Sequence, residues 1–172
     1  MKRLLTIPSP QQLRWITLLA LPATVAFFVF FRFHDRPLQP YTIVDYELAW
    51  TPARAEQMLG AWGEPVQRVV REALYIDFGF MPAYALFFSG LTLMLARASL
   101  GRMQTLGLWL ALGPFAAWVC DAIENFALLA ALNSPTSALL TLAGLCATVK
   151  FSLLLLCLLY WPVALVVNRL RA

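Results

Sequence analysis

Four ionisable residues stand inside long apolar stretches of this sequence, where charges are costly. Asp77 falls in the second stretch, Asp121 and Glu124 fall in the third, and Lys150 falls in the fourth. A charged side chain at membrane depth costs roughly 2.5–3.5 kcal/mol or more, so such side chains normally face the protein interior and pair. Carboxylates and an ammonium in this setting can bind a ligand, transfer protons, or form a structural ion pair.

The spacing of these residues predicts a shared polar face. Asp121, Glu124 and Asn125 stand at i, i+3 and i+4, which places them on one side of a helix. Tyr84 lies two turns from Asp77 on the same face of its helix. We therefore expect one ligand-binding site, formed by Asp77, Tyr84, Trp118, Asp121, Glu124, Asn125 and Lys150.

The elements that carry these residues are four apolar stretches, each long enough to cross a bilayer as a helix. Hydrophobic residues make up 61% of the 172-residue chain, charged residues only 13%, and the mean hydropathy is +0.72. A soluble domain has a lower apolar content, about 45–50%. The sequence predicts an all-α integral membrane protein, a four-transmembrane-helix bundle that forms a single membrane domain over residues 1–172. The expected spans are residues 13–33, 73–96, 104–132 and 138–167.

Basic residues predict the orientation of the spans. They lie before or at the start of the first expected span, between the second and third, and after the fourth, at Lys2, Arg3, Arg14, Arg97, Arg102, Arg169 and Arg171. The positive-inside rule then places both termini in the cytoplasm and loop 34–72 outside, in the inner membrane if the source is bacterial. At a rise of about 1.5 Å per residue, the four charges all fall in the outer half of the membrane, from about 6–8 Å deep for Asp77 to about 20 Å for Lys150.

The external loop contains a second local pattern. Thr51-Pro52 resembles a helix start, and the apolar stripe that follows predicts a short amphipathic helix, which ends near Gly60 and Gly63. The preceding segment, residues 41–50, is expected to be extended, with Asp45 and Glu47 solvated.

Other chemistries have weaker support in the sequence. The Lys and Arg residues form no run, so no nucleic-acid partner is expected. The three cysteines lie in apolar segments without a CxxC pair, and there is one histidine, so no metal site is predicted and any cofactor stays unknown. His34-Asp35 is interpreted as a solvated pair at the membrane edge.

The charge count leaves two negative charges unbalanced, because three carboxylates accompany one lysine. Three explanations stay open at this level. Some of the acids are protonated, a cationic ligand completes the site, or Arg32 and Arg71 reach in from the outer rim. The first two indicate a functional site and the third a structural one.

Three hypotheses about function follow. The first is a site that binds a lipid headgroup, a cation or a small amphiphile. The second is a structural or assembly subunit of a larger membrane complex, held together by a buried ion pair. The third is an intramembrane hydrolase in which Asp77 and Asp121 act on water as acid and base, so enzymatic activity is left open. The partners expected are the lipid bilayer, a lipid or cationic small ligand, and another membrane protein or a second copy of the chain.

Overall fold

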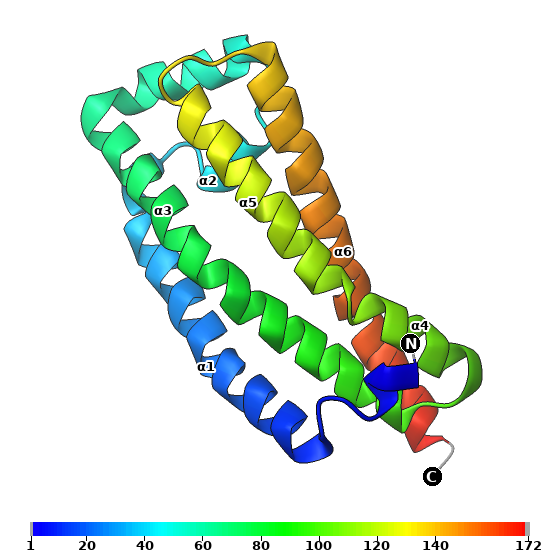
Figure 1. Ribbon diagram of the computed structural model, residues 1–172. Coiled ribbons are helices and arrows are strands. Elements are labelled where there is room, and N and C mark those ends of the chain that lie inside the picture. The colour runs from blue at the N-terminus through cyan, green and yellow to red at the C-terminus, as the bar shows by residue number, and fades with distance from the viewer. Residues whose placement is uncertain (1, 171–172) are drawn as a thin grey trace. The chain divides into compact units, whose positions relative to one another are not determined.

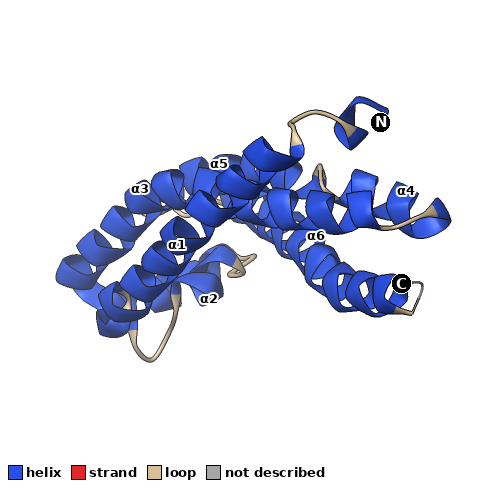
Figure 2. Ribbon diagram, turned by 90° about the horizontal axis from the view of Figure 1, so that it is seen from below, coloured by secondary structure: helices blue, strands red, loops and turns tan. Residues whose placement is uncertain are grey.

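The computed structural model describes residues 2–170 and consists of helices joined by short loops (Figures 1 and 2). Arg171 and the side chain of Lys2, which entered the orientation argument, lie outside what is described. A short 3-10 helix, η1 (Lys2–Leu5), precedes the first long helix, and a second, η2 (Arg36–Leu38), follows it. The α-helices are α1 (Pro10–His34), α2 (Ile43–Glu47), α3 (Pro52–Ala98), α4 (Gly101–Leu110), α5 (Gly113–Ala131) and α6 (Ser137–Arg169).

Four of these helical stretches are long and apolar enough to cross a membrane: α1, α3, α4 with α5, and α6. This confirms the predicted all-helical fold with four apolar spans and a short helix between the first two. Large apolar side chains cover the outside of the spans, and α1 alone exposes Trp15, Leu19 and Phe28 by more than half. Apolar surface on this scale requires a lipid environment, so the chain is an integral membrane protein.

The third span is interrupted, although the sequence led us to expect a continuous one. α4 ends at Leu110 and α5 begins at Gly113. The signal was present in the sequence, because Pro114 has no backbone N–H to donate to the carbonyl of Leu110, four residues before it.

The chain divides into two compact units, and the long helices run from one into the other. The loop unit contains residues 25–81 and 119–149, which include the whole first loop. The terminal unit contains the described parts of residues 1–24, 82–118 and 150–172. Each unit has a buried apolar cluster of its own.

In the loop unit, the first part of α3 forms the predicted short amphipathic helix. Its apolar stripe contributes Ala55, Met58 and Trp62 to the buried cluster, and the Trp62 indole N–H donates a 2.7 Å hydrogen bond to the carbonyl of Leu38. Gly63 then takes φ +62°, a conformation that favours glycine, and the chain turns sharply there (Figure 1). The apolar stripe of this short helix therefore packs the first loop against the buried cluster of the loop unit.

The prediction of an extended segment at residues 41–50 is wrong, because α2 forms there. Thr42 caps this helix through a reciprocal capping box with Asp45. Tyr46 and Glu47, on the opposite side, are buried. The chain leaves α2 through Trp50, which has φ +59° and whose ring lies against Gly144 of α6.

In the terminal unit, side chains donate hydrogen bonds to the backbone carbonyls of segments distant in the sequence. Arg97 donates to the carbonyls of Leu4 and Pro8, 2.8 Å from each, and so fastens the segment before α1. The Tyr160 hydroxyl of α6 donates a 3.1 Å hydrogen bond to the carbonyl of Met103. Gly107 allows this, because a side chain at residue 107 would collide with the Tyr160 ring.

Candidate functional site

Three of the four predicted charges are buried, and Asp77 is half-buried. Asp121 exposes 2% of its surface, Glu124 and Asn125 expose none, and Lys150 exposes 5%. Lys150 is the one buried basic side chain among the described residues. The cost of a bare charge in an apolar interior explains why residues of these types take inward positions on their helices.

Asn125 connects two of the predicted site helices inside the loop unit. Its side-chain amide nitrogen donates to the carboxylate of Asp77 at 2.8 Å and to the backbone carbonyl of Leu74 at 3.1 Å. Asp77 and Leu74 both belong to α3, so this one side chain joins α5 to α3. The two predicted residues are therefore in direct contact, and Asp121 and Glu124 lie on the same face of α5 as Asn125.

Glu47 is a buried acid that sequence reasoning missed. It was expected to be solvated, yet α2 turns it inward and leaves it 8% exposed. Its neighbour Tyr46 donates a 3.4 Å hydrogen bond to the carbonyl of Leu128, one turn beyond Glu124 on α5. The loop unit thus contains an acidic cluster from α2, α3 and α5, which we define as Glu47, Asp77, Asp121 and Glu124. A signal for Glu47 existed in the capping pair Thr42 and Asp45, which predicts a helix with Tyr46 and Glu47 on its other side.

Burial also affects Tyr46. Removal from water raises the pKa of its phenol far above the ordinary value, although the charge of Arg71 acts in the opposite direction. The Tyr46 hydroxyl is therefore a neutral hydrogen-bond donor at physiological pH, and it contributes no further negative charge next to Glu47.

Two arginines were candidates for neutralising the cluster from the outer rim. Arg71 donates to the side-chain oxygen of Asn133 at 3.0 Å. Arg32 lines a separate hollow at the end of α1, and it forms no ion pair with any residue that the structure describes. The explanation that relies on these arginines gains no support from Arg32, and for Arg71 it stays a prediction.

Three predicted site residues belong to the terminal unit. Tyr84 on α3 is buried, Trp118 on α5 is exposed, and Lys150 on α6 is buried and engaged in an interaction. Their grouping with the acids of the loop unit stays a prediction.

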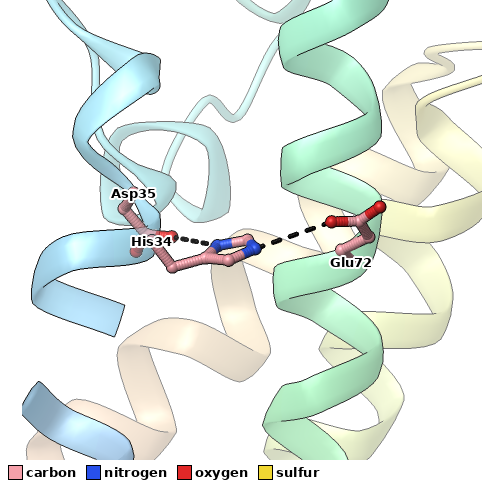
Figure 3. Close-up of polar contacts among 3 residues, drawn as sticks. All are labelled: His34, Asp35 and Glu72. Carbon is pink, nitrogen blue, oxygen red and sulfur yellow. Dashed lines mark hydrogen bonds and ion pairs between the residues drawn. The ribbon is translucent and has the colours of Figure 1, made fainter. Parts of the chain in front are cut away.

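A second group of titratable side chains surrounds His34 at the end of α1 (Figure 3). The His34 Nδ1 atom lies 3.3 Å from the Asp35 carboxylate, and Nε2 lies 3.7 Å from that of Glu72 on α3. The expected solvated pair is mostly enclosed, since the side chains of His34 and Asp35 are 16% and 19% exposed. Burial raises the pKa of Asp35 above its ordinary value, while the hydrogen bond and charge of His34 lower it by less.

No three His, Cys, Asp or Glu side chains within residues 2–170 converge as metal ligands. Comparisons with protein-family models, with curated proteins and with solved structures find no match to this chain. Function is therefore inferred from the chemistry of the site.

Proposed function

We propose that this integral membrane protein binds an amphiphile with a protonated amine at the acidic cluster. The observation that supports this most directly is the number of buried charges. Glu47, Asp121 and Glu124 are buried carboxylates, and Lys150 is the one buried base among the described residues. Charges removed from water favour opposite charges nearby, and the buried acids outnumber the buried base three to one. We propose that this net negative charge favours a cationic ligand at the cluster.

Asn125 favours an amine that carries N–H groups. Its Oδ1 atom is buried and accepts no hydrogen bond from the described residues. Leaving such an acceptor unsatisfied costs about 1–3 kcal/mol, and an ammonium group with N–H donors removes that cost. A quaternary ammonium carries the same charge but cannot donate, so we expect it to bind less tightly.

An amphiphile is favoured over a small water-soluble amine because the acids lie on apolar spans. A ligand with a hydrocarbon tail concentrates in the bilayer and gains about 0.8 kcal/mol for each buried methylene.

The test compares headgroups on one hydrocarbon tail. The melting temperature of the purified protein in a neutral detergent is measured with increasing dodecylamine, dodecyltrimethylammonium or dodecanol. The affinity for each ligand is calculated from how far it stabilises the folded protein. We expect dodecylamine to stabilise most and dodecanol least. Glu124→Gln and Asp121→Asn should each weaken dodecylamine binding at least tenfold, about 1.4 kcal/mol, whereas Glu56→Gln, at an exposed acid of α3, should leave it unchanged.

Two outcomes would reject the proposal. One is equal stabilisation by all three headgroups. The other is a lower melting temperature in the Glu124 and Asp121 variants with no loss of amine affinity. The second result would identify the charges as a structural ion-pair network and would favour the role of an assembly subunit.

A further inference from the structure

A second candidate site of opposite charge lies in the loop unit, at the C-terminal end of α1. A hollow of about 470 Å³ opens there between α1, η2 and α2. Phe28 and Phe31 of α1 form one apolar wall, and Ile43 and Val44 of α2 form another. Phe28 is 67% exposed on a helix apolar enough to span a membrane, so this wall is continuous with lipid-facing surface.

Two arginines line the same hollow without a counter-ion. Arg32 and Arg36 are exposed, and neither makes an ion pair with any residue in the described part of the chain. The Arg36 guanidinium lies 4.5 Å from the centre of the Phe33 ring, a cation–π contact that limits its motion. Two unneutralised guanidinium groups beside an apolar wall favour a ligand that combines an anion with a hydrocarbon chain.

One acid shares the lining but does not cancel this charge. The Asp35 carboxylate lies 3.3 Å from Nδ1 of His34, whose other nitrogen lies near Glu72. The carboxylate of Asp45, on α2, accepts hydrogen bonds from the backbone N–H and the hydroxyl of Thr42 in the capping box. The hollow therefore presents two arginines against one carboxylate that already has a partner.

We propose that this hollow binds an anionic phospholipid, with its phosphodiester on Arg32 and Arg36 and an acyl chain along Phe28 and Phe31. Guanidinium groups bind phosphate oxygens through paired, charge-assisted hydrogen bonds. The end of a membrane span is the level at which lipid phosphates lie, so guanidinium groups placed there stand at the height of the headgroups. This site uses other residues than the acidic cluster and attracts the opposite charge, so it stands or falls independently of the proposed amine site.

The test measures lipid retention by native mass spectrometry of the full chain, extracted in a neutral detergent with equal amounts of phosphatidylglycerol and phosphatidylcholine. We expect the unmodified protein to retain phosphatidylglycerol at least fivefold over phosphatidylcholine. The double variant Arg32→Gln, Arg36→Gln should lower this preference to less than twofold. Arg68→Gln, an exposed arginine of α3 in the same unit, is the matched control and should keep the preference.

Val44→Asp tests the hollow without removing an arginine. The new carboxylate would face the bound phosphate, so the preference should fall, whereas Val44→Asn should retain at least half of it. The proposal is overturned if the double variant keeps the preference or if Arg68→Gln loses it equally, because binding is then general electrostatics. Displacement of the lipid by inorganic phosphate at millimolar concentration would also overturn it, since it would make this a phosphate site.

Discussion

Asn125 is the residue on which the proposed choice of ligand depends, because it uses both amide N–H groups inside the protein and leaves its oxygen without a donor. The inward placement of Asp121 and Glu124 was predictable from sequence, since their charge in an apolar span permits little else. The burial of Glu47 was not predicted, because residues 41–50 were expected to be extended and only the five-residue helix α2 turns Glu47 inward. The asparagine bond to Asp77 depends on how α5 packs on α3, which spacing along one helix does not determine.

Replacing Asn125 with leucine should destabilise the protein by about 1–3 kcal/mol, since it removes the hydrogen bonds that the amide donates to the Leu74 carbonyl and the Asp77 carboxylate. Chemical denaturation in detergent measures the change. Asn133→Ala removes the exposed bond to Arg71 and should cost no more than about 0.5 kcal/mol. Equal costs for the two variants would contradict a stabilising role for the buried amide.

Asp35 should make stability depend on pH. Burial raises the pKa of its carboxyl above the ordinary 3.8, so the folded protein holds this proton more tightly than the unfolded chain. The folded state therefore gains stability as the pH falls through the window above 3.8 and loses it as the pH rises through that window. Asp35→Asn should raise the melting temperature at neutral pH, with the difference shrinking toward zero below about pH 3.8. A lower melting temperature at neutral pH would show that the contact with His34 outweighs burial.

At the scale of elements, the long helices follow from apolar length, while the loop depends on contacts between segments distant in the sequence. The amphipathic stripe of the first part of α3 was predictable from its spacing, and so was its end near Gly63. The position of Trp50 against α6 was not, because it requires Gly144 to be without a side chain. The ring atoms of Trp50 lie 2.8–2.9 Å from where a Cβ atom of residue 144 would stand.

Two glycine-to-alanine variants separate two effects on stability, the steric clash of an added methyl group and the higher helix propensity of alanine. Gly144→Ala should cost about 1–3 kcal/mol, because the tryptophan ring has to shift and the segment after α2 shifts with it. Gly60→Ala meets nothing within 4 Å and should stabilise the helix by about 0.5–1 kcal/mol. Thermal unfolding of both variants measures the difference. A neutral effect of Gly144→Ala would contradict the close packing of Trp50 on α6.

At the scale of the whole molecule, composition and the four apolar stretches predict an integral membrane protein with four spans, and the structure contains four helical stretches long and apolar enough to cross a membrane. The ends of the long helices differ from the predicted spans by a few residues. The exception is the start of α3, where the helix begins at Pro52 because polar turns precede the apolar span predicted at residues 73–96. The division into two units has no counterpart in the sequence pattern, because it reflects which helix segments pack together and not where the chain changes composition.

The charge distribution predicts that loop 34–72 lies outside the cell membrane and that the α3–α4 connection lies inside. Gln39→Cys should react with a membrane-impermeant maleimide on intact cells. Arg102→Cys should react only after permeabilisation, and the unmodified chain, whose cysteines all lie in spans, should react weakly. The reverse labelling pattern would invert the orientation.

The most direct test of the amine site is a crystal or cryo-EM structure of the protein with a bromine-labelled dodecylamine. We predict that the amine nitrogen lies within about 4 Å of a carboxylate oxygen of the acidic cluster, the separation of an ion pair, and that it donates to Oδ1 of Asn125. Amphiphile bound only along the exposed outer faces of the spans, with every acid of the cluster contacting protein alone, would contradict the proposed function.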